Sequence, residues 1–356
     1  MKPAVAVPAT AALVYRAWSR KSLTPLGIAT AVLTAVAHAV HPWSVFFALL
    51  AVFFLIGTAA TKVKHDVKAR LTQSSSGASG GEGARTHVQV LANSLVASAL
   101  ILLHTRQLSR SAPSSTACWK PASHLPVVGI VANYAAVAAD TLSSELGLLS
   151  KSRPRLITAP WRAVPPGTNG GVSPAGLLAA VAGAAAISLT AVALTPFCRE
   201  WDASSKAAFV AAMTAVGVFG SLLDSLLGAL LQASVVDVRT GKVVEGAGGR
   251  RVPVHAAGSL HLKQRAKVRS AAEQQEGAGS VASSSGVDAA TAESARRAGS
   301  IMPEDGKHNE SRRLDTGRDI LSNNGVNFVM AASASVVAVL GAAFVWEIPF
   351  SAVLAV

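Results

Sequence analysis

Residues 126–155, PVVGIVANYAAVAADTLSSELGLLSKSRPR, decide the fold, because an apolar run there ends in carboxylates and then in cations. The run approaches the roughly 20 residues that cross a hydrocarbon core. Asp140 and Ser144 lie four positions apart, so a helix places them on one stripe. Thr141 and Glu145 share the next stripe in the same way. This stretch therefore predicts a transmembrane helix that carries carboxylates at its basic end.

Composition predicts that most of the chain lies in a membrane. Of the 356 residues, 51% are hydrophobic and only 14% are charged, whereas about 25% of residues in soluble domains are charged. Polar loops separate eight apolar segments: 4–18, 25–40, 43–60, 88–104, 126–149, 173–197, 207–234 and 326–346. We predict an all-α fold, a polytopic integral membrane helical bundle of about seven or eight transmembrane helices. Segment 4–18 also resembles a signal peptide, but its basic residues follow the apolar run, which favours an anchor.

The distribution of charge orients these segments. Alternate loops are basic, and they fall on one side of the bundle: 16–21, 62–70, 151–162 and 239–318. The positive-inside rule places that side in the cytosol, or in the equivalent compartment of an organelle, and both termini opposite. The net charge of +13 then reflects loops attracted to anionic headgroups, and we expect no nucleic-acid partner. The endoplasmic reticulum and the plastid envelope both fit this pattern.

Two polar segments lack the apolar residues that a packed core requires, and we predict that both are disordered. Residues 73–83 form a short loop within a membrane domain at 1–245. Residues 246–317 form a long, basic, low-complexity loop, after which 318–356 return to the same membrane domain as the last transmembrane segment.

Cysteine and histidine spacings indicate no zinc or redox motif. Cys118 and Cys198 both lie near the far membrane edge. They either pair, if that side is oxidising, or remain two thiols. The sequence contains no His-x-x-x-His helix, no phosphate loop and no serine-hydrolase elbow.

Two further polar segments belong to the side that carries Asp140. Residues 167–171, GTNGG, lead into a span. Their glycines suit a phosphate cradle, and equally a plain turn that caps the next helix. Asp224 lies between Gly220 and Gly228, which permit close helix packing. An unpaired carboxylate would be costly there, so we expect a metal ion or an amide donor beside it.

The last polar segment begins the final span. Asn323, Asn324 and Asn327 provide amides that hydrogen-bond a carboxylate or coordinate a hard cation. A carboxylate inside a bilayer is a site hypothesis by default. Because all four polar segments belong to one side, the sequence predicts a single site.

Several motifs in order give the chain a recognisable signature. They are ADTLSSELG at 139–147, LSKSRPRLIT at 149–158, PPGTNGGV at 165–172, GSLLDSLLGA at 220–229 and NNGVN at 323–327. Together they resemble the transmembrane protein 19 family, over most of residues 20–346. Plant and cyanobacterial relatives in that family include the phytyl-phosphate kinase of vitamin E synthesis. Leu142-Ser143 stands where the family usually has Trp-Ala.

The resemblance implies transfer of a phosphoryl group from a nucleoside triphosphate, CTP or ATP, to an isoprenoid monophosphate at the membrane surface. Asp140, Glu145 and Asp224 would be the catalytic residues and would hold Mg²⁺. The residues expected to bind substrate and phosphate are Lys151, Arg153, Arg155, Gly167, Thr168, Asn169, Gly170, Gly171, Asn324 and Asn327.

A transporter or a non-enzymatic membrane scaffold is the competing hypothesis, because intramembrane carboxylates also serve ion coupling. The two hypotheses differ in the depth of the polar residues. A transporter places its site near the bilayer centre, whereas these residues cluster at the basic end of each span. The sequence therefore favours lipid-phosphate chemistry over transport.

Overall fold

The computed structural model describes residues 1–75, 80, 83–110, 118–249, 252 and 312–349. Its longer helices are α1 (Pro3–Ser19), α2 (Pro25–Val40), α3 (Val45–Lys62), α5 (His87–Arg110), α6 (Leu125–Gly147), α7 (Pro174–Leu194), α8 (Ala203–Leu231) and α13 (Asn323–Val345). Within these described ranges, six helices are long and apolar enough to cross a membrane, and α2 is a shorter apolar helix. The predicted polytopic helical bundle is confirmed, with six such helices where about seven or eight transmembrane helices were predicted. Each of the eight apolar segments forms a helix.

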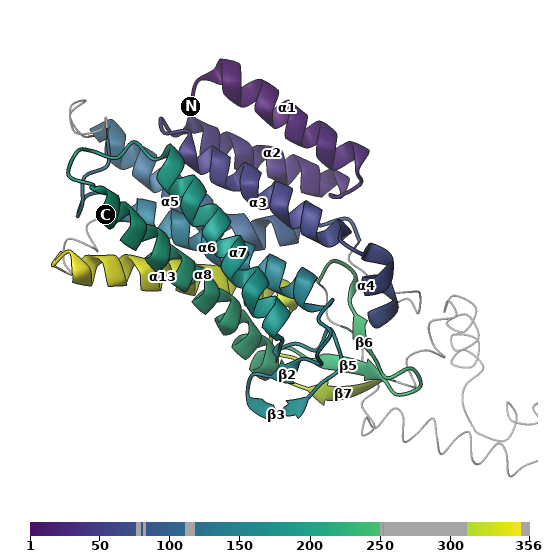
Figure 1. Cartoon of the computed structure of the whole chain (residues 1–356). Helices are drawn as coiled ribbons and strands as arrows, with labels where there is room; N and C mark the ends of the chain where they lie inside the picture. The colour runs from purple at the N-terminus through teal and green to yellow at the C-terminus, as the bar shows by residue number, and fades with distance from the viewer. Residues whose placement is uncertain (76–79, 81–82, 111–117, 250–251, 253–311, 350–356) are drawn as a thin grey trace, which may run out of the picture.

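Helix α6 forms the centre of the bundle (Figure 1). Every side chain from Leu125 to Asp140 is buried. Helices α3, α5, α7, α8 and α13 all pack against α6, while α2 packs against α3 and α5. Helix α1 packs on the outer side of α2. The stretch that ends in the carboxylates is therefore the core of the protein.

Small residues allow the helices to approach α6 closely. A Cβ atom at Gly183 of α7 would lie 2.6 Å from the carbonyl oxygen of Ala138. A Cβ atom at Gly217 of α8 would lie 2.9 Å from the carbonyl oxygen of Ala135. Larger residues at these two positions would push α7 and α8 away from α6, which carries Asp140.

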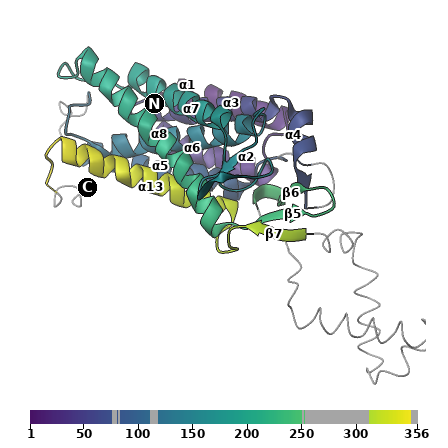
Figure 2. The same cartoon turned by 60° about the horizontal axis from the view of Figure 1, so that its bottom comes forward.

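The sequence did not predict the two small sheets, which both lie at one end of the bundle (Figures 1 and 2). One sheet has the order β1-β6-β5-β7 and the other has the order β3-β2-β4. The strands are β1 (Gln73–Ser74), β2 (Arg155–Leu156), β3 (Ala159–Ala163), β4 (Gly171–Val172), β5 (Ser234–Asp237), β6 (Lys242–Glu245) and β7 (Arg312–Thr316). A seven-residue helix, α4 (His65–Leu71), connects α3 to the first of these sheets.

These strands change the predicted extent of disorder. β1 lies in the segment 73–83 and pairs with β6. β7 lies in the segment 246–317 and pairs with β5. The start of the first segment and the end of the second therefore pair with the β5–β6 hairpin. The rest of the long basic loop, 253–311, lies outside the described residues.

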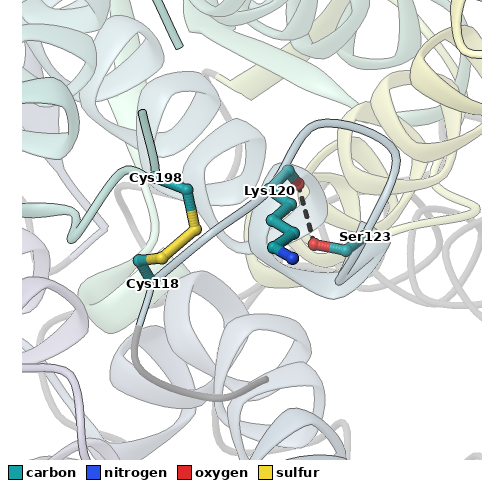
Figure 3. The surroundings of a disulfide bond; sticks show 4 residues. All are labelled: Cys118, Lys120, Ser123 and Cys198. Carbon is teal, nitrogen blue, oxygen red and sulfur yellow. Dashed lines mark hydrogen bonds between the residues drawn. A yellow bond between two sulfur atoms is a disulfide. The ribbon is translucent and has the colours of Figure 1, made fainter. Parts of the chain in front are cut away.

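The opposite end of the bundle contains a disulfide between Cys118 and Cys198 (Figure 3). The sequence left open whether these cysteines pair or remain two thiols, and in the structure they are paired. Next to it the indole of Trp119 packs against Trp201, with ring centroids 4.8 Å apart. The peptide N–H of Trp119 also donates to the carbonyl of Pro196. The disulfide and the aromatic contacts join the loop before α6 to the loop before α8.

We predict from this arrangement that Lys62, Arg155 and Arg318 lie on one side of the membrane and Arg110 on the other. Single cysteines at these positions test the prediction, and the paired native cysteines leave little background. A membrane-impermeant maleimide should label the first three from one side only. Labelling of Arg110→Cys and Arg155→Cys from the same side would contradict it.

Candidate functional site

The four polar segments line one cavity of about 760 Å³ at the end of the bundle that carries the sheets. They come from the end of α6, the turn 167–171, the second half of α8 and the start of α13. The lining side chains are predominantly polar or charged. Segments far apart in the sequence therefore meet at one end of the bundle, as the sequence predicted.

Two of the expected carboxylates face this cavity from neighbouring helices. Asp140 of α6 is buried, with 9% of its surface exposed, and Asp224 of α8 is half-buried. When the amide of Asn327 is oriented to donate, its nitrogen lies 3.1 Å from Oδ1 of Asp224. The Asp224 carboxylate thus has the amide donor that its burial led us to expect.

Glu145 has a different environment from the one predicted. Its Oε2 accepts a hydrogen bond from Nζ of Lys68, and the Thr61 hydroxyl donates to its Oε1 at 2.7 Å. Nη2 of Arg85 in turn donates to Oγ1 of Thr61 at 3.2 Å. Glu145 is therefore engaged in an ion pair, which does not match the expected role of a Mg²⁺ ligand. In the described part of the chain, no three His, Cys, Asp or Glu side chains group as metal ligands.

The sequence did not indicate that Lys68, Thr61 and Arg85 belong to the cavity, and Lys68 is the most buried of the three. It belongs to the short helix α4, and only 4% of its side chain is exposed. Nζ also donates to the carbonyl of Ala60 at 3.0 Å. An ammonium has three donors, and within the described residues these two bonds to Ala60 and Glu145 use two of them. The remaining donor is available to a ligand in the cavity, which Lys68 lines.

The turn 167–171 lines the cavity but uses much of its backbone internally. The N–H groups of Thr168, Asn169 and Gly171 donate to Pro165 O, Ser234 Oγ and Thr168 O, respectively. Gly170 has a φ of 77° and packs against α8, where a Cβ atom would lie 2.7 Å from the carbonyl of Ser225. These contacts correct the expectation of a cradle of free amides, because the turn mainly anchors β4 to α8.

Other expected phosphate ligands lie elsewhere. Lys151, Arg153 and Arg155 are exposed and do not line the cavity, and Nη1 of Arg155 donates to the carbonyl of Pro160. Asn324 is buried, and its Nδ2 donates to the carbonyl of Gly248. Among the asparagines that begin α13, it is Asn323 and Asn327 that line the cavity.

Three helices begin at the cavity, and each has a side-chain cap. The cap residues Thr24, Ser173 and Ser322 accept hydrogen bonds from the N–H groups of Gly27, Gly176 and Gly325. All three cap residues line the cavity. The N-terminus of a helix carries partial positive charge, so α2, α7 and α13 together favour an anion here.

A buried histidine network lies near the other end and was also missed. The backbone N–H of Trp43 donates to Nδ1 of His41, so Nε2 of His41 carries the proton and donates to Nδ1 of His104 at 3.0 Å. The Tyr134 hydroxyl lies 2.6 Å from Nε2 of His38. These residues join α2, α5 and α6 and are remote from the cavity.

Comparison with known proteins agrees with an integral membrane protein. The Arabidopsis thaliana protein named Protein PGR is 37% identical over 233 residues, which are 64% of this chain and 78% of that protein. Uncharacterized membrane protein MJ0933 of Methanocaldococcus jannaschii is 40% identical over 106 residues, 30% of this chain and 40% of that protein. No solved structure matches the chain. The family model described as integral membrane protein DUF92 matches residues 8–335, and the chain therefore belongs to this family of multi-pass membrane proteins.

Proposed function

We propose that this protein transfers a phosphoryl group from a nucleoside triphosphate, CTP or ATP, to an isoprenoid monophosphate at the cytosolic face of the membrane. The observation that carries the proposal is the cavity that gathers Asp140, Asp224 and the Lys68–Glu145 pair at the ends of spanning helices. The isoprenoid tail would remain in the bilayer while its phosphate enters the cavity. The resemblance to the transmembrane protein 19 family, whose plant relatives include a phytyl-phosphate kinase, supports this choice of substrate.

The charges of the cavity suit this chemistry. Phosphoryl transfer depends mainly on positioning and on neutralising the charge of the phosphates. Lys68 and Arg85 both line the cavity, and Glu145 and Thr61 fix their side chains. We therefore assign phosphate binding to Lys68 and Arg85, with Glu145 as the positioning residue. The helix N-termini would add further stabilisation of negative charge.

Magnesium fits the same cavity. Mg²⁺ usually takes one or two carboxylates and completes its shell with waters and substrate phosphates, so Asp140 and Asp224 are a sufficient protein contribution. Asn327 would keep the Asp224 carboxylate oriented. The ion would supply charge neutralisation between the phosphate groups. Lys151, Arg153, Arg155 and Asn324 have no part in this arrangement.

We predict that purified protein converts phytyl or farnesyl monophosphate to the diphosphate with CTP or ATP and Mg²⁺. Asp140→Asn and Asp224→Asn should each lower turnover by about 10²-fold or more, because each removes a charge and keeps the shape. Asp66→Asn is a matched control, since that side chain on α4 is 96% exposed. Product formation followed by chromatography is the measurement.

Two outcomes would contradict this prediction. Normal turnover by both asparagine variants would remove these carboxylates from the mechanism. Absence of product across a panel of prenyl phosphates with both nucleotides would favour the transporter or scaffold instead.

The Lys68–Glu145 pair generates a separate prediction. Glu145→Gln leaves the buried Lys68 ammonium without its counter-charge and should lower thermal stability markedly. Lys68→Gln should raise KM for the phosphate substrate. In the double variant Lys68→Gln/Glu145→Gln stability should recover while activity should not. Thermal unfolding and steady-state kinetics provide the two measurements.

The exposed residue Arg70 lies on the same short helix, so Arg70→Gln is the matched control and should behave like the unmodified protein. Recovery of turnover in the double variant would show that the ion pair is only structural. That result would not contradict the proposed kinase activity, which the Asp140→Asn and Asp224→Asn variants test separately.

A further inference from the structure

Three histidines meet at the end of the bundle opposite the cavity, and the chemistry proposed for the cavity does not involve them. His41 lies in the turn between α2 and α3, His104 lies near the end of α5, and His124 is the N-cap residue of α6. The rings of His41 and His104 are stacked with centroids 4.9 Å apart, and the centroids of His104 and His124 are also 4.9 Å apart. The cluster therefore joins three elements of the bundle.

Aromatic side chains enclose two of these imidazoles. His41 and His104 are fully buried, whereas His124 is half-buried. The ring of Phe46 packs 4.6 Å from that of His41, and the ring of Trp43 packs 5.3 Å from that of His104. A charge on either buried imidazole would lose most of its hydration in such surroundings. Both imidazoles are therefore neutral in this arrangement.

Hydrogen bonds fix the position of the proton on each ring. Nδ1 of His41 accepts from the backbone N–H of Trp43 at 3.0 Å, so Nε2 of His41 donates to Nδ1 of His104 at 3.0 Å. A second proton would have to occupy Nδ1 on either ring. It would then place two donors face to face, because both Nδ1 atoms act as acceptors here. Protonation of either ring is therefore incompatible with this contact.

The titratable neighbours of His41 oppose its protonation further. They are His38, His104, His124 and the α-amino group of Met1. The amino group of Met1 donates a hydrogen bond to the carbonyl oxygen of His41. All four neighbours are bases, so a proton on any one of them disfavours a second proton on His41.

A second tie between α2 and α6 lies deeper in the bundle and responds differently to acid. Nδ1 of His38 donates to the carbonyl of Thr34 at 2.7 Å, and the Tyr134 hydroxyl lies 2.6 Å from Nε2 of His38. A tyrosine hydroxyl can donate or accept, so this pair tolerates a proton on His38. Loss of the contact between His41 and His104 would therefore open only the end of the bundle.

We propose that the hydrogen bond between His41 and His104 is an acid-sensitive latch. At neutral pH it holds the α2–α3 turn against α5. Acidification of the compartment opposite the cavity adds a proton to the cluster, beginning at half-buried His124, and breaks the bond between the two buried rings. The α2–α3 turn then separates from α5. The inference does not require the proposed kinase activity, because it concerns the other end of the bundle.

The closed and open forms of the latch differ in their affinity for protons. Burial lowers the pKa of His41 in the closed form to about 3, from an ordinary value of 6.5 that it regains in water. The open form therefore binds more protons than the closed form below about pH 6.5. The closed form loses stability as the pH falls from there towards about 3.

Hydrogen–deuterium exchange of the full-length protein in neutral detergent, at about pH 7.5 and about pH 5, tests the latch. Rates are normalised for the intrinsic effect of pH on amide exchange. We expect the protection of residues 38–46 to fall about tenfold or more at the lower pH, and that of 128–136, at the centre of α6, to stay the same. Unchanged protection of 38–46 would overturn the proposal. Equal loss in both segments would show general acid unfolding and would overturn it too.

Two variants separate the latch from other titrating groups. His41→Asn/His104→Gln removes both titrating rings, and an asparagine oxygen can still accept the N–H of Trp43 two residues later. His65→Asn/His87→Asn is the matched control, because both of these histidines are exposed. Size-exclusion profiles check that each variant is folded.

We expect the latch variant to keep its protection of residues 38–46 at low pH, and the control variant to lose it as the unmodified protein does. A folded latch variant that loses protection to the same extent as the unmodified protein would overturn the proposal. If the latch variant does not fold, the comparison of the two segments in the unmodified protein still decides the matter.

Discussion

Burying charge near the ends of membrane-spanning helices is costly, and this cost determines which side chains lie beside the carboxylates of the bundle. Asp140 is buried and Asp224 is half-buried in the bundle, and neither position is tolerable without donors, cations or water nearby. The compensating groups come from remote segments, since α13 brings Asn327 to Asp224 and α4 brings Lys68 to Glu145. The close packing of α7 and α8 on the central helix makes these contacts possible.

The sequence predicted the bundle well, because run length and charge asymmetry are local properties. Each apolar segment forms a helix whose ends lie within six residues of the expected ones, and the polar segments meet at one end, as charge counting indicated. Even the neighbour of Asp224 followed from an energetic argument, because a buried carboxylate needs a donor and Asn327 was at the right end. The length of the apolar runs and the energetic cost of burying a carboxylate are enough to predict the helices and the end of the bundle at which their polar residues lie.

The roles of single cations could not be predicted in this way. In the sequence, Lys68 resembled an ordinary cation of a cytosolic loop, but in the structure it is buried against Glu145. Lys151 and Arg153 were predicted to bind phosphate, but both are exposed. Such differences depend on tertiary packing, which the spacing of residues in the sequence does not reveal. The strand pairing of 73–74 and 312–316 was missed for the same reason, because each strand finds its partner across a long stretch of chain. The buried His41–His104 contact likewise joins residues that appear isolated in the sequence.

We propose that Asp140 and Asp224 belong to one site that accepts a metal ion and a phosphate together. Electron paramagnetic resonance with Mn²⁺ in place of Mg²⁺ tests it most directly, on purified protein with and without pyrophosphate. We expect a single Mn²⁺ site per chain, at which Mn²⁺ binds more tightly when pyrophosphate is present. Asp140→Asn and Asp224→Asn should each abolish that binding, and Asp66→Asn should preserve it. Mn²⁺ binding that persists in either of the first two variants would contradict a shared site.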